Sequence, residues 1–357
     1  MMDAQIIPLE KYHDYKLNAA DSSKFFLEMD NSNFLINNEY FNKIVVGYTL
    51  IGFSAKPEII YHPTFNTKIS VGGYLLKYSG LDNFTTVMPV LTFQYQPTNE
   101  INILMGTMKY HQLVDPIYQP ERYFTNNVEN GLQFLFNYSH IQSDIWLTWE
   151  KFIFNQSPYK EEMSVGTSTR AELLNPAPQL NIDFSFQSLV CHKGGQIDTL
   201  KSVPLQTLIN TATGLTCQYN SVDKNSNIGF RFFMLTFNDL SQKSVLQYQK
   251  GFGYYPQFFV KLKSFSATFT YWDGHDFFAK HGAPMFSSIS TIDATYTEEN
   301  RKLSKLQFAY SKQIGKNIFL NANIDVYYIP IQKLIDYAYG MQIIYRPQFL
   351  ISKINQL

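Results

Sequence analysis

The chain alternates hydrophobic and polar side chains with a period of two over most of its length. Between residues 51 and 62, Ile51, Phe53 and Ile59 share one phase, whereas Lys56 and Glu58 share the other. Successive side chains of a β-strand point to opposite faces, so this alternation predicts strands with one apolar and one polar face. The pattern recurs over residues 69–76, 86–96, 180–187 and 318–328.

The predicted strands are long. They run about 10 to 13 residues, whereas ordinary strands have a mode of about 5 or 6 and a tilted bilayer-spanning strand needs about 9 to 11. Their length therefore favours a transmembrane barrel over a soluble β protein.

The connections between these strands alternate between short and long. Short turns are expected at 63–66, 97–99, 139–141, 175–178, 220–224, around 263 and at 313–317, and long loops at 111–126, 155–162, 193–205, 238–249 and 273–302. Outer-membrane barrels have short periplasmic turns and long extracellular loops. We therefore assign the short turns to the periplasmic side.

Tyrosines recur in the apolar phase close to the predicted short turns and at the corresponding end of the last strand. They are Tyr61, Tyr95, Tyr138, Tyr219, Tyr310 and Tyr345. Amphipathic rings favour the membrane interface, so we interpret them as a periplasmic aromatic girdle. The alternative is that tyrosine is simply frequent here, with 25 copies.

Counting from the turns predicts fifteen strands between Ile51 and Arg346. Both termini of such a barrel belong in the periplasm, which requires an even number of strands. We place the missing strand within Lys24–Asn38, where Leu27 and Glu28 fall in opposite phases. The predicted fold is all-β, a transmembrane antiparallel up-and-down barrel of about 16 strands, with 14 and 18 as alternatives.

The barrel is expected to occupy residues 24–349 as one domain. Residues 1–23 are interpreted as a leader remnant or periplasmic segment, because Ala4-Gln5 resembles the end of a cleavage site. Residues 350–357 are expected to form a C-terminal tail. Residues 37–50 are a candidate loop or plug, because bulky side chains in the lumen phase argue against a wide pore. Those side chains are Leu76, Leu104, Leu135, Phe233, Leu235 and Phe259.

Composition agrees with a lipid-facing wall. Charged residues make up only 16% of the chain, whereas about 25% is usual for soluble domains. The 29 basic and 29 acidic residues balance, so nucleic acid is not an expected partner. No stretch approaches the roughly 18 consecutive apolar residues that a membrane-spanning helix needs.

Charged side chains of the polar phase are predicted to line the lumen. They are Lys56, Glu58, Asp144, Glu150, Arg170, Glu172, Asp183, Arg231, Lys261 and Asp325. Because both signs occur, we expect no strong ion selectivity. Arg170 and Glu172 share one face of a strand and Glu150 points inward from the next strand. They predict either a charged constriction or an ion-pair network that stiffens the wall.

The sequence offers little for catalysis or metal binding. Two imidazoles and two carboxylates are close in the chain, at Asp273, His275, Asp276 and His281. A His-Asp loop, however, usually reflects turn chemistry rather than a metal site. No Ser-His pair or phosphate-binding loop is apparent. Cys191 and Cys217 fall on opposite faces and opposite ends of adjacent strands, so no disulfide is expected. We predict no enzymatic activity, no cofactor and no bound metal.

The sequence resembles the porin-like outer-membrane barrels of Bacteroidetes-type bacteria. The stretches that carry the resemblance are Asn38–Asn42, Gly47–Leu50, Gly194–Asp198 and His281–Ser288. The resemblance implies a location in the bacterial outer membrane and a cleaved leader. In that group some barrels are pores and others are fixed subunits of larger machines.

Two functions are therefore kept open. The first is porin-like passage of small polar solutes through a mixed-charge, partly plugged lumen. The second is a structural subunit of a multi-protein outer-membrane complex without pore activity. Phe277, Phe278, Met285 and Phe286 are the candidate partner contacts, because exposed aromatic loop residues are costly in water. The expected surroundings are outer-membrane lipid and lipopolysaccharide, with protein partners in the second case.

Overall fold

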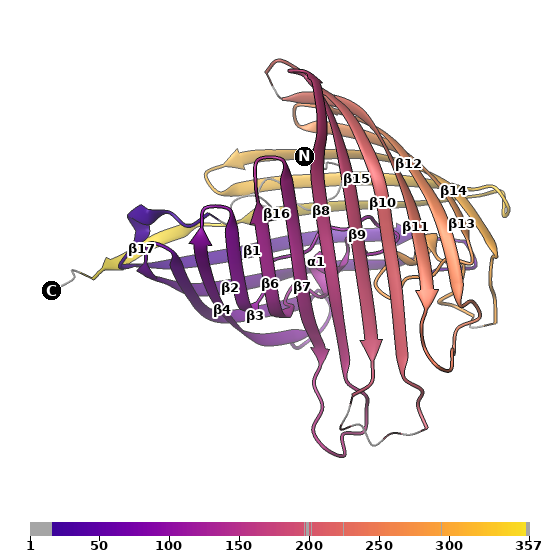
Figure 1. Ribbon diagram of the computed structural model, residues 1–357, viewed down its shortest axis with the longest axis horizontal. Helices are drawn as coiled ribbons and strands as arrows, with labels where there is room; N and C mark the ends of the chain where they lie inside the picture. Colours follow the sequence, from indigo (N-terminus) through magenta and orange to yellow (C-terminus); the bar gives the residue numbers. More distant parts are fainter. Residues whose placement is uncertain are drawn as a thin grey trace.

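The strands form one antiparallel sheet that closes on itself (Figure 1). The structure, a computed structural model, describes residues 16–354 except 196, 198, 199, 201, 224 and 294. The strands are β1 (Lys24–Glu39), β2 (Tyr48–Thr64), β3 (Thr67–Tyr78), β4 (Thr86–Thr98), β5 (Ile101–Thr107), β6 (Asn130–Asn137), β7 (Ile141–Lys151), β8 (Glu162–Ala177), β9 (Leu180–Lys193), β10 (Gln206–Asn220), β11 (Ser226–Asp239), β12 (Lys250–Leu262), β13 (Phe265–His275), β14 (Asn300–Gly315), β15 (Ile318–Ile329), β16 (Leu334–Tyr345) and β17 (Gln348–Lys353). The helical pieces are short: η2 (Ala19–Asp21), α1 (Arg122–Thr125) and η3 (Pro284–Phe286). None of the described helices is long and apolar enough to cross a membrane.

Strand β1 closes the barrel. Its residues 25–38 pair with β2 and its residues 31–39 pair with β16, so the first and last wall positions meet. The short β17 continues the β16 position beyond Arg346 and pairs with residues 24–28 of β1. The wall therefore has 16 positions, and a closed sheet leaves no unpaired edge in lipid.

The predicted fold class and strand number are confirmed, including the first strand before Ile51. The structure adds β17, so pairing continues past residue 349 into the segment expected to be a tail. The proposed leader remnant at Ala4-Gln5 lies outside the described residues. Of the candidate plug 37–50, residues 37–39 belong to β1 and residues 48–50 belong to β2, with a loop between them.

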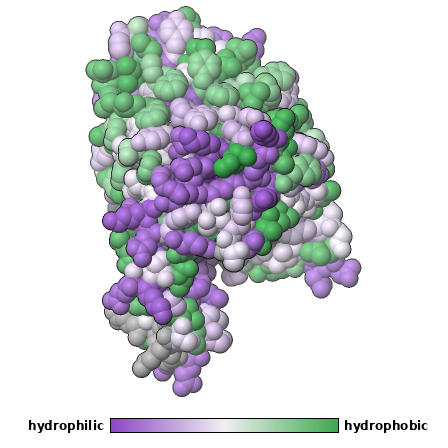
Figure 2. Space-filling view, turned by 90° about the vertical axis from the view of Figure 1, so that its right-hand side faces the viewer, coloured by the Kyte–Doolittle hydropathy of each residue, from purple (hydrophilic) through white to green (hydrophobic). Residues whose placement is uncertain are grey.

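The outer face of the wall is apolar. Large hydrophobic side chains are exposed on every second position of many strands, for example Ile324 at 53% and Phe308 at 51%. Figure 2 shows hydrophobic residues over much of the upper part and along the right-hand edge of the face in view, around a hydrophilic region in the middle. An apolar outer face of this kind suits contact with lipid tails.

Inward-facing side chains divide the interior into two parts along the barrel. Near the long-loop ends of the strands most are apolar, including Leu189, Leu208, Phe233, Phe237, Tyr255, Trp272, Leu303 and Ile329. Toward the short turns most are polar, including Gln94, Asn102, Asp183, Gln218, Gln257, Gln307, Asn321 and Gln342. The six bulky lumen-phase residues noted in the sequence are all buried.

Two long loops pack among the inward-facing apolar side chains. Leu113, Val114, Ile117 and Tyr118 of loop 108–129 share one hydrophobic cluster with Phe277, Met285 and Phe286 of loop 276–299 and with strands from β7 to β15. Helix α1, in the first loop, lies within the ring of strands (Figure 1). The long loops thus fold back into the barrel instead of extending away from it.

Candidate functional site: a charged network inside the barrel

Loop 108–129 is bonded to several sides of the wall. Its contacts are Val114 N–H to Gln187 of β9 at 2.8 Å, Asp115 to Lys305 of β14 at 3.4 Å, Glu121 to Tyr48 of β2 at 2.6 Å and to Asn38 of β1 at 3.3 Å, and Tyr123 to Arg346 at 2.6 Å. Because β9 and β1 belong to different sides of the ring, the loop spans the interior.

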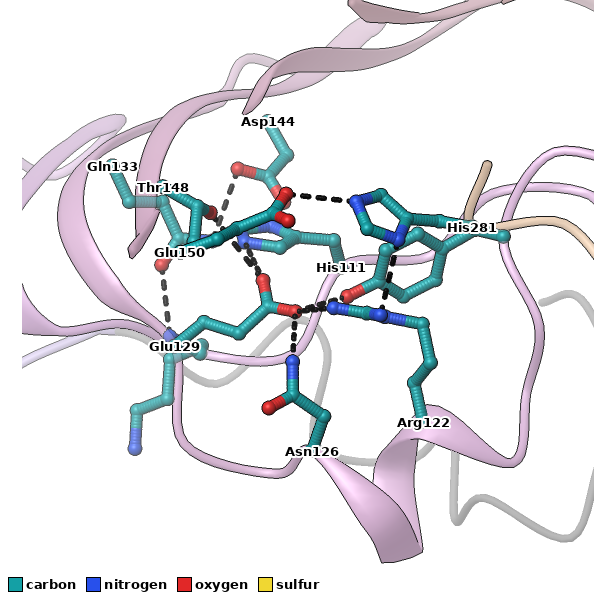
Figure 3. A network of polar contacts seen from close by, with 11 residues as sticks. His111, Arg122, Asn126, Glu129, Gln133, Asp144, Thr148, Glu150 and His281 are labelled. Carbon is teal, nitrogen blue, oxygen red and sulfur yellow. Dashed lines mark hydrogen bonds and ion pairs between the residues drawn. The ribbon is translucent and has the colours of Figure 1, made fainter. Parts of the chain in front are cut away.

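Glu129 is the centre of the network at the end of this loop (Figure 3). Its Oε1 accepts hydrogen bonds from Arg122 Nη2 at 2.6 Å, Tyr118 OH at 2.7 Å and Asn126 Nδ2 at 3.2 Å. Burial alone raises the pKa of Glu129, but the neighbouring His111 and Arg122 hold it below its ordinary value. Glu129 is therefore an ionised carboxylate at neutral pH.

His111 links this loop to β7. Its Nδ1 lies 3.0 Å from Asp144 Oδ2, and Gln133 Nε2 donates to the other Asp144 oxygen at 3.0 Å. The imidazole stacks on Trp146 with ring centroids 3.8 Å apart, and its side chain is 1% exposed. His111 Nε2 has no hydrogen-bond partner and lies 3.8 Å from Glu129 Oε2. A carboxylate that fixes Nδ1 and leaves Nε2 available is the arrangement of an imidazole base.

His281 joins the two loops. Arg122 Nη1 lies 3.1 Å from His281 Nδ1, and Glu150 Oε1 lies 2.7 Å from His281 Nε2. Arginine has only donors, so Nδ1 accepts and the ring carries its proton on Nε2, which donates to Glu150. Lys280 extends the network from Glu150, at 3.1 Å, to Glu162 of β8, at 2.8 Å.

The ten predicted lumen residues are buried or half-buried, and several form ion pairs. Lys56 lies 3.4 Å from Glu58, Arg170 lies 2.6 Å from Asp183, and Asp325 lies 3.2 Å from Lys305. Asp144 and Glu150 belong to the network above, Arg231 bonds to Gln257, Glu172 pairs with His140, and Lys261 is half-buried on β12.

The predicted grouping of Arg170, Glu172 and Glu150 is wrong. Antiparallel pairing of β7 with β8 sets Gln142 opposite Arg170 and Trp149 opposite Met163, so Glu150 and Arg170 lie at opposite ends of the strands. The alternation correctly predicted that all three side chains face inward. It did not predict which end of β7 lies beside which end of β8.

The six girdle tyrosines lie on the outward phase. Tyr95, Tyr138, Tyr219 and Tyr345 are exposed, and Tyr61 and Tyr310 are half-buried. Their role at a membrane interface stays a prediction.

The prediction that Phe277, Phe278, Met285 and Phe286 are exposed partner contacts is wrong. Phe277, Met285 and Phe286 are buried, and Phe278 is partly buried against the same cluster. Trp272 packs against Phe277 with ring centroids 5.0 Å apart and against Phe286 at 5.7 Å. The loop folds inward because this contact removes its aromatic side chains from water.

The cysteine prediction is confirmed, and the histidines of the 273–281 segment separate. Cys191 is buried, Cys217 is exposed and both are free. His275 lies 3.3 Å from Asp276, whereas His281 joins the internal network. Within the described part of the chain, no three histidine, cysteine or acidic residues are grouped to hold a metal ion.

The sequence reasoning missed His111, Arg122 and Glu129. Loop 108–129 contains Leu113, Val114 and Ile117 beside these polar residues, and apolar side chains in a long loop are a signal for inward packing. The predicted loop or plug at 37–50 contributes to the same cluster through Val45, which is buried.

The comparison with protein families decides the assignment. The family described as "Lipid A 3'-O-deacylase-type" matches residues 17–354. The chain belongs to this family. The prediction that the chain is not an enzyme is therefore overturned, because its family is named for a deacylase.

Solved structures similar to this family member are outer-membrane barrels. OprD from Pseudomonas aeruginosa is 8% identical, with a TM-score of 0.52 over 98% of both chains. A BenF-like porin from Pseudomonas fluorescens is 9% identical, with a TM-score of 0.52 over 92% of this chain and 100% of that one. A loop L8 deletion mutant of OmpT, an outer membrane protein of Vibrio cholerae, is 8% identical, with a TM-score of 0.55 over 91% of this chain and 100% of that one. No curated protein matches the sequence.

These findings confirm a porin-like barrel of the bacterial outer membrane. At such identities the similarity concerns the fold alone, so the function has to be argued from the interior of this barrel.

Proposed function

We propose that this barrel passes small polar solutes and that loop 108–129 closes the passage in the conformation described above. The polar side chains toward the short turns and the mixed charges of the interior support a hydrated passage with little ion preference. The observation that carries the proposal is the Arg122–Glu129–His281 network, because it ties loop 108–129 to loop 276–299 and, through Glu150, to β7.

The closed state has a polar and an apolar part. The apolar cluster resists spontaneous opening, since its loop side chains would have to return to water. The buried ion pairs can be broken by the loss of a single charge, and removing one partner of such a pair costs about 3 to 5 kcal/mol. We therefore expect opening to be controlled by the charges.

Single-channel conductance in planar bilayers tests this proposal. The wild-type barrel is expected to be mostly closed. Arg122→Ala is expected to increase the open fraction because it leaves Glu129 and His281 without the guanidinium group that joins them. Lys302→Ala is the control, since its ion pair with Asp273 is largely exposed, at 46% and 35%.

Replacing the loop tests the same closure without relying on the effect of a single substitution. Thr107 pairs directly with Asn130, so a short turn in place of residues 109–128 leaves the strand pairing intact. This variant is expected to conduct continuously. Absence of conductance in the wild type, in Arg122→Ala and in the loop replacement would remove the channel proposal.

The family match and His111 favour a second candidate function, hydrolysis of an ester-linked acyl chain of lipid A. His111 Nε2 has no hydrogen-bond partner and lies 3.8 Å from Glu129 Oε2, while Asp144 holds Nδ1. In its neutral form this imidazole is positioned to take a proton from water. That water would attack the ester carbonyl and release a fatty acid and a sugar hydroxyl. With His111 1% exposed, substrate entry requires the same loop movement as conduction.

Mass spectrometry of lipid A incubated with the reconstituted barrel tests the second candidate. Loss of one 3'-O-linked acyl chain is expected with the wild type and with His140→Ala, whose side chain is 71% exposed. His111→Ala is expected to abolish the loss. Full activity in His111→Ala would exclude this residue as the base, and intact lipid A with the wild type would exclude hydrolysis without affecting the channel proposal.

A role as a structural subunit of a larger complex stays a prediction. The aromatic loop that suggested such a role is not exposed, because Phe277, Met285 and Phe286 lie in the interior.

A further inference from the structure

A cavity of about 100 Å³ lies between loop 108–129 and the wall formed by β1, β14, β15 and β16. It is separate from the His111 and His281 contacts. Its lining comes from four sources: the end of β1 with Tyr40, the segment from Asp115 to Phe124, Ala283 and Phe286 of loop 276–299, and residues of β14, β15 and β16. The space exceeds the roughly 10 to 15 Å³ that a single water needs.

The charges around this cavity do not balance. Asp115, Glu121 and Asp325 line it together with one cation, Lys305. Lys305 Nζ lies 3.2 Å from Asp325 Oδ2 and 3.4 Å from Asp115 Oδ2, so it is shared by two carboxylates. Burial raises the pKa of Glu121, while hydrogen bonds from Tyr48 and Asn38 oppose that shift. Apart from Glu121, the lining contains two carboxyl side chains and one cationic side chain.

An unpaired acceptor adds an independent observation. Asn323 lines the cavity and is 7% exposed, and its Oδ1 has no hydrogen-bond partner. A buried carbonyl without a donor is unfavourable, which indicates that a donor belongs there. The rings of Tyr40 and Tyr327 line the same space, with centroids 5.9 Å apart. Aromatic faces attract cations.

We propose that this cavity binds a small primary ammonium compound. An ammonium group supplies three donors and one positive charge, which suits a carbonyl oxygen, two carboxylates and aromatic rings. The small volume limits the organic part to a few carbons. The site does not depend on whether the barrel conducts or hydrolyses, and a ligand here would bridge loop 108–129 to the wall.

Isothermal titration calorimetry of the detergent-solubilised full chain with ethylammonium chloride tests the proposal. The wild type is expected to bind, and Asn323→Leu and Asp325→Asn are each expected to weaken binding about tenfold or more, the effect of losing a charge-assisted hydrogen bond. Asp183→Asn is the matched control, because it removes an interior carboxylate from β9 and leaves the cavity unchanged.

A charge-preserving variant separates binding from folding. Ala338 lines the cavity and is buried, so Ala338→Leu fills the space without altering any charge. It is expected to abolish binding, with folding checked by heat-dependent mobility on a gel. Equal binding of potassium and ethylammonium, no heat of binding in the wild type, or unchanged affinity in Ala338→Leu would each overturn the proposal.

Discussion

At the scale of single residues, Glu129 shows how the interior tolerates a charge. A buried carboxylate is costly in isolation, so it persists only where donors and positive charges surround it. Glu129 receives bonds from Arg122, Tyr118 and Asn126, and Thr148 Oγ1 lies 3.4 Å from its other oxygen. The carboxylate thereby orders its own loop as well as the contact with the wall.

This arrangement predicts a loss of stability in acid. Because the folded-state pKa of Glu129 lies below its unfolded value, the ionised carboxylate stabilises the fold above about pH 4.3. The stabilisation is lost as the pH falls through the folded pKa. The free energy of unfolding, measured by urea titration in lipid vesicles from pH 7 to pH 3, is expected to decline more in the wild type than in Glu129→Gln. The control is Glu299→Gln, whose side chain is 63% exposed, and it is expected to show the same pH dependence as the wild type. If the free energy of unfolding fell equally with pH in all three proteins, the role of Glu129 would be contradicted.

At the scale of elements, the strands could be predicted and the paths of the loops could not. Each strand carries its own alternation, so residues 318–329 reveal an apolar and a polar face without knowledge of any neighbour. The position of a loop depends on residues far away in the chain. Phe286 is buried because Trp272 and Tyr255 lie beside it, and no local pattern states this. The same limit explains why the pattern of single strands does not show that Glu150 and Arg170 lie at opposite ends of β7 and β8.

Packing between β7 and β8 gives a prediction about the loop contact. A Cβ on Gly166 would lie 2.1 Å from the Trp146 ring, the ring on which His111 stacks. Gly166→Val is therefore expected to displace Trp146 and to lower the free energy of unfolding by about 1 to 3 kcal/mol. Urea unfolding followed by tryptophan fluorescence measures this. Gly73→Val is the control, because its Cβ would meet only a carbonyl oxygen at 3.8 Å; equal effects of the two changes would contradict the packing argument.

At the scale of the whole molecule, the wall has an outer face for lipid and an inner face for polar groups and loops. This division explains the scarcity of charge, since outward positions exclude it. The family assignment illustrates another limit of sequence reasoning. The carboxylate–imidazole contact of His111 and Asp144 joins a loop to a strand, and the separation of the two residues in the chain conceals it.

The orientation of the wall can be tested at its outer face. Ile324 is the seventh residue of the twelve in β15, is 53% exposed and lies opposite the outward-facing Phe308. An arginine near the bilayer midplane of a barrel costs about 2 to 4 kcal/mol. Ile324→Arg is therefore expected to lower the free energy of unfolding in lipid vesicles by that amount, and much less in detergent micelles, which deform around a charge. Val222→Arg, in a turn at a position 84% exposed, should have little effect in either medium. An Ile324→Arg barrel as stable as the wild type in vesicles would place this face of β15 away from lipid.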